Sequence, residues 1–270
     1  MQTSEDLRPT PISGRTPETQ HAEFLGLSFS LLSPPQVIRL IIDGCRGPYR
    51  YVVTPNAYHV VAVHDNPDVL LPVYRGAWLS LCDSQILRAL AKLDGQSLPL
   101  ITGSDLTATL LSGLNFRART DAPKLLVVGP DPSIAGSLRQ AYPNLAINVL
   151  SAPAGLARSA DLRRAVARSC MAEHWDILLL CMGCPAQELI ASQVGELGRK
   201  SGTALCVGAA IDFIAGTRPR SPIWVQKFGL EWAYRLVREP GRLWRRYLIE
   251  SPKIFRIYIA TRSVRKSSTR

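Results

Sequence analysis

The sequence predicts an α/β fold: a Rossmann-like, mostly parallel sheet flanked by helices, with a basic amphipathic helical appendage at the C-terminus. Three observations support this prediction. Short apolar runs alternate with segments of helical length, several runs are apolar on both faces, and the excess positive charge lies in the last fifth of the 270 residues. Strands of a parallel sheet covered by helices on both faces need such runs. With 46% hydrophobic residues, the chain is long enough to bury a core.

The chain is expected to have three parts. Residues 1–22, rich in Pro, Thr and Ser, are expected to form a disordered tail, residues 23–216 an α/β core, and residues 217–270 the basic C-terminal appendage. The apolar runs predict strands at 51–54, 125–129, 145–150, 177–183 and 204–208. The segments between them predict helices at 34–44, 84–94, 104–113, 133–142, 159–174 and 185–200.

Membrane spans and disulfides are not expected. No apolar run approaches the roughly 18 residues that a membrane-spanning helix needs, and the N-terminus lacks the order of a signal peptide. We therefore expect a cytosolic protein. The six cysteines lie in or beside apolar stretches without a framework spacing, so we expect buried, reduced thiols.

The charge distribution separates the C-terminal segment from the rest. Residues 1–216 hold 18 basic and 18 acidic side chains, whereas residues 217–270 hold 14 basic side chains against three glutamates, so the whole net charge of +11 lies there. A cationic segment that also carries tryptophans and tyrosines is expected to have a polyanionic partner. Composition alone leaves an anionic membrane surface, phosphorylated ligands and nucleic acid as alternatives.

Residues 225–248 combine an apolar stripe with a row of arginines, and Pro240 is expected to divide them into two short helices. One interpretation is an interfacial element that lies on lipid headgroups, because a polar face of one charge sign accompanies Trp and Tyr. The alternative is an ordinary charged helix packed on the body, since any surface helix is amphipathic.

Small polar residues follow two apolar runs directly, where open α/β sheets place their ligands. After the first run, Thr54 and Asn56 are candidate binding residues or simply caps of the next helix. After the second, Asp83 is a candidate general base, because a carboxylate in a partly apolar cleft can take a proton from a sugar hydroxyl. It could equally cap the helix expected at 84–94.

Two turns add weaker candidates. Thr102, Gly103 and Ser104 open a helix and would present backbone N–H groups to an anion. In the segment CMGCPAQE, Gly183 is expected to end a strand and the following proline to start a helix, so that Gln187 directs its amide into the cleft.

Metal and common nucleotide motifs are not expected. The single CxxC at Cys181 and Cys184 has no second pair, so a structural zinc site has little support. His59, beside an apolar run, is expected to be a structural histidine. The chain has neither GxGxxG nor a P-loop lysine, and no Asp-x-Asp pair that would hold a divalent ion on a nucleotide diphosphate.

Taken together, the motifs resemble the WecG/TagA/CpsF family of bacterial glycosyltransferases. The matching segments run in family order over about residues 24–255: FLGLSFSLLS, YVVTPNAYHVV, LCDSQILRALAKLDG, LPLITGSDL, LLVVGPDPS, WDILLLCMGCPAQE, CVGAAIDFIAGTRPRSPIW and GLEWAYRLVREPGRLWRRYLIESPKIF. Within the family, the likeness is greatest to the exopolysaccharide branch, the β-1,4-glucosyltransferases of xanthan-type repeat-unit assembly.

The resemblance implies an inverting transfer from a UDP-sugar to a sugar on undecaprenyl pyrophosphate, at the cytoplasmic face of the membrane and without a required metal or other cofactor. Family residues correspond to Thr54, Asn56, Asp83 and Gln187, with Asp83 as the base. In the family the basic C-terminal segment docks the enzyme on the membrane and completes the active site, which agrees with the charge distribution of residues 217–270. Arginines suited to bind pyrophosphate are Arg235, Arg242, Arg245 and Arg246.

Two departures from the family bear on the donor sugar. Many relatives have Pro-Glu-Arg where this chain has Pro99-Leu100-Ile101, and Ala-Asp-Gly where it has Cys82-Asp83-Ser84. We expect glucose as donor and acceptor sugar, with an N-acetylmannosamine donor as the alternative. A nucleic-acid-binding module and a non-catalytic membrane scaffold are rival hypotheses, but no nucleic-acid partner is expected. A homo-oligomer is possible, as in some relatives.

Overall fold

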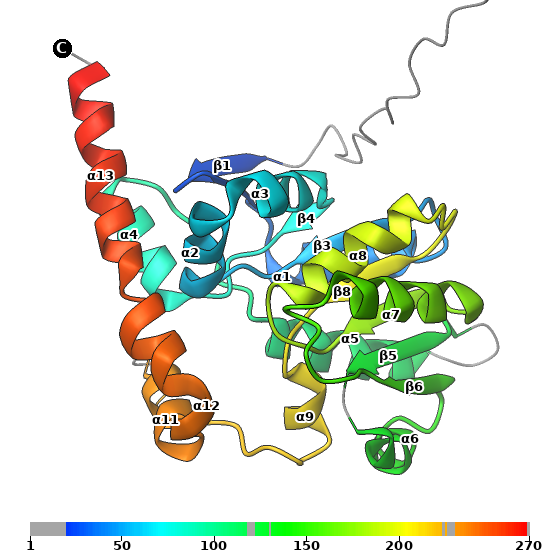
Figure 1. The fold of residues 1–270 in the computed structure, drawn as a ribbon. Coiled ribbons are helices and arrows are strands. Elements are labelled where there is room, and N and C mark those ends of the chain that lie inside the picture. Colours follow the sequence, from blue (N-terminus) through cyan, green and yellow to red (C-terminus); the bar gives the residue numbers. More distant parts are fainter. Residues whose placement is uncertain (1–19, 118–121, 130, 223–224, 226–229, 269–270) are drawn as a thin grey trace, which may run out of the picture.

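The structure, a computed structural model, describes residues 20–117, 122–129, 131–222, 225 and 230–268. Its centre is a six-stranded sheet in the order β4-β3-β8-β7-β5-β6, with every pair parallel. The strands are β3 (Arg50–Val53), β4 (Leu79–Ser80), β5 (Leu125–Gly129), β6 (Ile147–Ser151), β7 (Ile177–Leu180) and β8 (Thr203–Cys206). This confirms the predicted α/β, Rossmann-like architecture (Figure 1).

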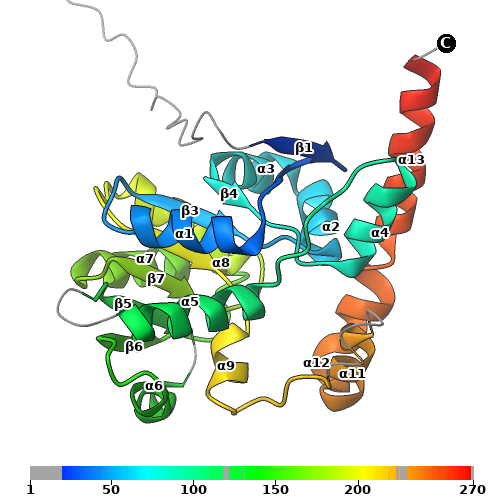
Figure 2. The same ribbon diagram turned by 180° about the vertical axis from the view of Figure 1, so that it is seen from behind.

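Helices cover both faces of the sheet, as Figures 1 and 2 show from opposite sides. On one face, side chains such as Val53, Val128 and Leu180 pack against helices that share their hydrophobic cluster. These helices are α2 (Ala57–Asp65), α3 (Pro67–Gly76), α4 (Gln85–Leu93), α7 (Ala160–Ala172) and α8 (Ala186–Glu196). The alternate strand residues, such as Val127 and Leu179, face a second cluster. That cluster includes α1 (Pro34–Gly44), α5 (Gly103–Arg117), the turn η1 (Pro132–Ile134), α6 (Ala135–Ala141) and α9 (Ala210–Ile214).

The pairing register brings the carboxyl ends of the strands to one edge. Val53 pairs with both Ser80 and Cys206, and Leu180 also pairs with Cys206. The segments that follow β3, β4, β7 and β8 therefore begin side by side. In open α/β sheets this edge is the usual ligand site.

Most predicted elements are confirmed, and the differences have local causes. All five expected strands and all six expected helices occur within a few residues of their predicted bounds. The sequence prediction gave no bounds for α2, α3, β4 and α9, although it expected a helix after Asn56 and a strand end before Asp83. Helix α2 buries five of its nine residues, so no clear polar stripe marks where it begins and ends. The prediction that Pro185 lies in the first turn of a helix is wrong by one position, because Pro185 is the N-cap and α8 begins at Ala186.

The six cysteines are free and buried, as predicted. Before the sheet, β1 (His21–Phe24) and β2 (Leu27–Ser30) form an antiparallel hairpin whose first strand includes the last two residues of the expected tail. Residues 1–19 of that tail lie outside the described residues.

The C-terminal segment is helical and lies along one side of the body (Figure 1). Its described elements are α11 (Glu231–Arg238), α12 (Pro240–Trp244), the π-helical turn η2 (Arg245–Glu250) and α13 (Lys253–Ser268). Pro240 separates the first two helices, as predicted. Among the described residues, no helix combines the length and apolar character needed to span a bilayer.

Candidate active site

The segment after β3 contributes Thr54 and Asn56, and both side chains have local partners. The Thr54 hydroxyl donates to the carbonyl of Cys206 over 2.8 Å, which ties the end of β3 to the end of β8. Asn56 is the N-cap of α2, and its side-chain oxygen accepts the Tyr58 N–H over 3.0 Å. The capping interpretation therefore holds for Asn56. The residue also lines two adjoining cavities at the carboxyl edge of the sheet.

Asp83 follows β4 and is not the cap of the next helix. Ser84 takes that role, since its hydroxyl accepts the Leu87 N–H. The Asp83 backbone N–H donates to the carbonyl of Pro55, which joins the loops after β3 and β4. Asp83 lines both cavities.

The environment of Asp83 favours its protonated form. Burial raises the pKa of the carboxyl from 3.8 to about 7, and the neighbouring Glu231 carboxylate adds to the increase. The Gly103 N–H and the Arg235 guanidinium oppose it. A carboxyl that titrates near neutral pH is suited to proton transfer.

The turn at Thr102 holds Asp83 from the other side. The Gly103 N–H, at the start of α5, donates to Asp83 Oδ2 over 3.3 Å. A Cβ at Gly103 would lie 3.0 Å from the Val207 carbonyl oxygen and 3.3 Å from the Thr54 hydroxyl, so the turn needs glycine here. Thr102 caps α5 through Asp105, and Ser104 lines both cavities. The anion that this N–H binds is thus the Asp83 carboxylate itself.

The segment after β7 supplies Gly183 and Gln187 to the smaller cavity. No atom would lie within 4 Å of a Cβ at Gly183, so the backbone there is open. Gln187 is buried, and its amide is held at both ends: the oxygen accepts the Gly208 N–H over 2.9 Å, and the nitrogen donates to Glu188 over 2.8 Å. Gln187 therefore lines the cavity and also links Glu188 of α8 to Gly208 after β8.

The predicted arginines differ in whether they line a cavity. Arg235 lines both cavities and lies 5.1 Å over the Phe213 ring. Arg246 lines the smaller cavity, lies 4.4 Å over the Tyr58 ring, and has a buried Nε without a hydrogen-bond partner among the described residues. Arg245 is 73% exposed and pairs with Glu250, away from both cavities. The side chain of Arg242 lies outside the described residues.

The two cavities meet at Asp83. The larger, of about 480 Å³, lies between the body and the C-terminal segment, and its wall includes Trp232, Leu248 and Phe255. The smaller, of about 180 Å³, lies over the ends of β3, β7 and β8. Five residues line both: Asn56, Asp83, Ser104, Arg235 and Tyr247. The carboxylate can therefore face molecules in either cavity.

Sequence reasoning missed several lining residues. Sequence reasoning did not single out Asp212 of α9 or Arg218, which form an ion pair in the wall of the smaller cavity. Glu231 and Trp232 of α11 were also missed. The amphipathic pattern of that helix does not specify which face turns toward the body.

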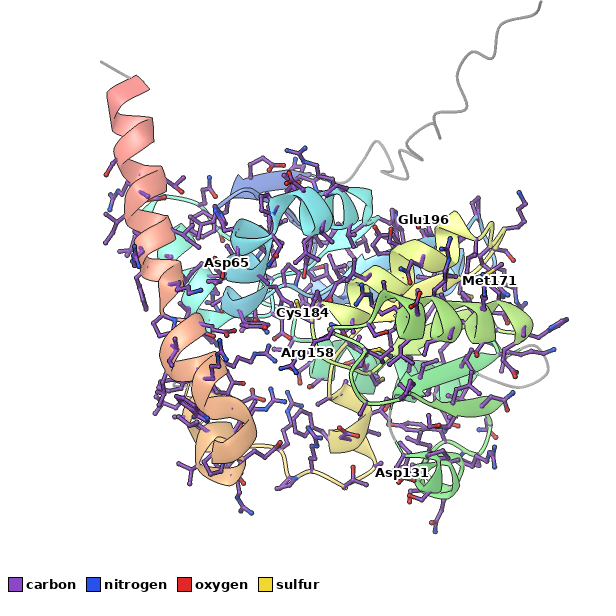
Figure 3. All side chains as sticks on the ribbon, in the orientation of Figure 1. Asp65, Asp131, Arg158, Met171, Cys184 and Glu196 are labelled. Atoms are coloured by element: carbon purple, nitrogen blue, oxygen red, sulfur yellow. The ribbon has the colours of Figure 1, made fainter. Side chains whose placement is uncertain are left out.

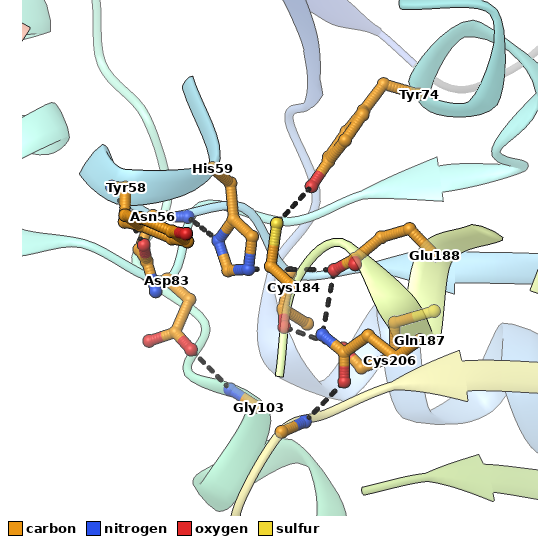
Figure 4. A network of polar contacts seen from close by, with 12 residues as sticks. Asn56, Tyr58, His59, Tyr74, Asp83, Gly103, Cys184, Gln187, Glu188 and Cys206 are labelled. Carbon is orange, nitrogen blue, oxygen red and sulfur yellow. Dashed lines mark hydrogen bonds and ion pairs between the residues drawn. The ribbon is translucent and has the colours of Figure 1, made fainter. Parts of the chain in front are cut away.

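One buried cluster contains possible metal ligands. Atoms of His59, Cys184 and Glu188 lie within 4.8 Å of one another. However, His59 Nδ1 accepts the Asn56 N–H over 2.8 Å, so the neutral ring carries its proton on Nε2, which faces Glu188. A metal ion at Nε2 would have to displace this proton and break the Asn56 bond. The cluster is therefore better suited to hydrogen bonding (Figure 4).

Comparison with known families gives one result. The model of a family described as "Glycosyl transferase WecG/TagA/CpsF family" matches residues 22–268. The match covers the hairpin, the sheet with its helices, and the described C-terminal helices. It therefore includes every residue that lines the two cavities.

Proposed function

The chain belongs to the WecG/TagA/CpsF family of glycosyltransferases, and on that premise we propose the reaction that it catalyses. The enzyme transfers glucose, with inversion and in β-1,4 linkage, from UDP-glucose to glucose on a polyprenyl pyrophosphate. It acts at the cytoplasmic face of the bacterial plasma membrane, during assembly of an exopolysaccharide repeat unit. The family match supports glycosyl transfer; the sugars, the lipid and the location are our proposal.

The observation that carries the proposal is the place of Asp83. It lies at the carboxyl edge of a parallel sheet, where two cavities of different character meet. A donor and an acceptor need one cavity each and a proton acceptor between them. The smaller cavity suits the nucleotide diphosphate, because Arg235 and Arg246 line it. The larger, with its aromatic wall, suits the lipid-linked sugar.

In the proposed step, Asp83 takes the proton of an acceptor hydroxyl as the hydroxyl oxygen attacks the anomeric carbon of the donor. The new C–O bond forms as the bond from that carbon to the β-phosphate oxygen breaks, and the electron pair leaves with UDP. A single displacement from the opposite face inverts the configuration. The pKa of about 7 suits this role, since the ionised carboxylate is available at neutral pH.

We propose that two arginines stabilise the negative charge on the departing UDP. The buried Nε of Arg246 is an N–H donor without a hydrogen-bond partner among the described residues, and Arg235 lies beside the base. One guanidinium group can donate two parallel hydrogen bonds to phosphate oxygens. The Gly103 N–H is directed at Asp83, so we assign no phosphate contact to it. We propose that these groups act without a divalent metal.

The C-terminal segment is proposed to dock on anionic lipid. Of the eleven exposed large apolar residues in the described part of the chain, eight lie in this segment: Leu230, Trp232, Val237, Trp244, Leu248, Ile249, Phe255 and Ile259. Basic and aromatic side chains accompany them, the composition of an interfacial helix. Docking there would place the larger cavity next to the membrane-bound acceptor.

The test is a radiolabel transfer assay with purified protein, UDP-glucose or UDP-N-acetylmannosamine, and polyprenyl-pyrophosphate-glucose in liposomes, with and without EDTA. We expect transfer from UDP-glucose that survives EDTA. Transfer only from the N-acetylated donor would retain the family reaction and reject glucose. Absence of transfer, together with salt-sensitive retention of RNA or DNA, would reject the proposal in favour of nucleic-acid binding.

A further inference from the structure

A buried chain of polar contacts, three of them hydrogen bonds, borders the smaller cavity (Figure 4). It begins at the Asn56 backbone N–H, which donates to Nδ1 of His59 over 2.8 Å. The other ring nitrogen, Nε2, lies 3.6 Å from Oε1 of Glu188. The histidine thus connects the segment after β3 to helix α8.

The chain continues from Glu188 to the segment after β8. Oε1 of Glu188 accepts the Gln187 amide N–H in a hydrogen bond of 2.8 Å. The amide oxygen of Gln187 in turn accepts the Gly208 N–H over 2.9 Å. Oε1 of Glu188 therefore contacts both His59, which accepts the Asn56 N–H, and Gln187, which accepts the Gly208 N–H.

The burial of this chain makes its bonds consequential. His59 is 4% exposed, Glu188 1% and Gln187 2%. Burial lowers the pKa of His59 to about 3, so the ring is neutral at physiological pH, and it raises the pKa of Glu188 to about 7. A buried group deprived of its partner keeps the full cost of desolvation, so the chain holds its members in one arrangement.

We propose that His59 and Glu188 are positioning residues for the transfer reaction, which fix Asn56 beside Asp83 and Gly208 at the rim of the smaller cavity. The inference rests on the proposed function. His59 also lines the smaller cavity, whereas Glu188 lines neither cavity, and we assign no role in proton transfer to either side chain. Their effect is geometric, since Asn56 lines both cavities and Gly208 lines the smaller one. A misplacement of such groups by about 1 Å can reduce the rate about a hundredfold.

Two pairs of variants separate positioning from mere folding. H59L and E188L remove the hydrogen bonds. H59Q keeps an oxygen for the Asn56 N–H, as in a capping box, and E188Q keeps an oxygen for His59 and Gln187. The matched control is V61A, which truncates another buried side chain of α2 that takes no part in these polar contacts.

We expect H59L and E188L to raise KM for the sugar nucleotide and to lower kcat/KM by about 10- to 100-fold. The conservative variants should recover most of that loss. The midpoint of the pH profile should stay unchanged, because Asp83 is untouched. The inference is overturned if E188L loses no more activity than V61A at an equal loss of Tm, or if E188Q is as impaired as E188L.

A second measurement keeps the inference testable if the wild type transfers no sugar, a result that would reject the proposed function alone. In ¹⁵N-labelled protein, the amide signals of Asn56 and Gly208 should shift and exchange faster in H59L and E188L than in V61A. Unchanged amides would overturn the inference. So would a bound zinc ion in the purified wild type that is lost in E188L, since metal coordination would then hold the cluster.

Discussion

The α/β body and the C-terminal segment keep their apolar side chains in different places. In the body, Val128, Leu178 and Leu205 belong to strands that are buried on both faces. In the segment, α11 and η2 bury none of their described residues, and half or more of the surface of Leu248 and Ile249 is exposed. The same kinds of side chain thus serve a core in one region and a surface in the other.

Apolar contacts, ion pairs and hydrogen bonds hold the segment to the body. Ile254 and Tyr258 of α13 enter the body's hydrophobic cluster. Lys253 pairs over 2.8 Å with Asp65, which Figure 3 labels beside the start of this helix. Since the body supplies Asp83 and the segment supplies Arg235 and Arg246, the site depends on both regions and on the contacts between them.

The largest expected effect tests the body's part of the site. D83N should lower kcat by about 100- to 10,000-fold, because it removes the general base and keeps the shape of the side chain. Sugar transfer measured at saturating substrates checks this, with thermal unfolding to confirm the fold. The control is D176N, at the opposite edge of the sheet, where the carboxylate accepts the Lys124 N–H. Full activity in D83N would exclude Asp83 as the base.

Within the segment, the arginines provide an internal comparison. R246A and R235A should each reduce kcat/KM by about 10- to 100-fold if their guanidinium groups stabilise the leaving diphosphate. R245A removes the same charge from a side chain that is 73% exposed and paired with Glu250, so it should stay within about twofold of wild type. Equal losses in all three variants would indicate a general effect of net charge, without a specific phosphate site.

The exposed apolar residues distinguish the regions by membrane affinity. A triple change of Trp244, Leu248 and Ile249 to serine should weaken binding to phosphatidylglycerol vesicles by at least about tenfold, since each side chain loses apolar area to bury. The matched control changes Val69, Leu93 and Phe116, the three exposed large apolar side chains in the described part of the body, to serine. Sedimentation with vesicles measures both. Equal losses would contradict docking through the segment.

The pH profile tests the environment that both regions give Asp83. Because its pKa is raised to about 7, the base is ionised above neutral pH, and kcat/KM should fall about tenfold per unit as pH decreases below 7. Stability has the opposite dependence. A raised pKa stabilises the folded state below the ordinary value of 3.8, and this contribution is lost as pH rises to about 7. D83N should therefore increase Tm more at pH 8 than at pH 4, and an equal change at both would contradict the shift.

The fold could be predicted where burial determines the pattern. The runs that became β5 and β7 are apolar on both faces, which few elements other than covered parallel strands require. Strand β4 has only two residues, so its short apolar run placed Asp83 at a strand end without giving the bounds of the strand. The bounds of α2 were not predicted, because burial on most sides removes the polar stripe that identifies a helix.

The site could be predicted only in part, for related reasons. Thr54, Asn56 and Asp83 follow apolar runs directly, so the strand-end rule found them without knowledge of the strand order. The roles of His59 and Glu188 depend on a contact between residues 129 positions apart in the sequence, which no local pattern specifies. Arg245 and Arg246 are neighbours in sequence, yet one faces solvent and the other the cavity. That choice follows from how the segment docks on the body.

The smallest expected effect concerns that docking. The Tyr258 hydroxyl donates to Asp94 of the body over 2.7 Å, while the ring packs 6.4 Å from Phe24. Y258F keeps the ring and removes the hydrogen bond, so proteolysis within residues 230–268 should become a few-fold faster, with little change in Tm of the body. Y234F makes the same change in α11, where the ring lies under Arg238, and is the control. If Y258F is cut no faster than Y234F, this hydrogen bond is not needed, and the apolar packing of Ile254 and the ion pair of Lys253 with Asp65 suffice to hold α13 on the body.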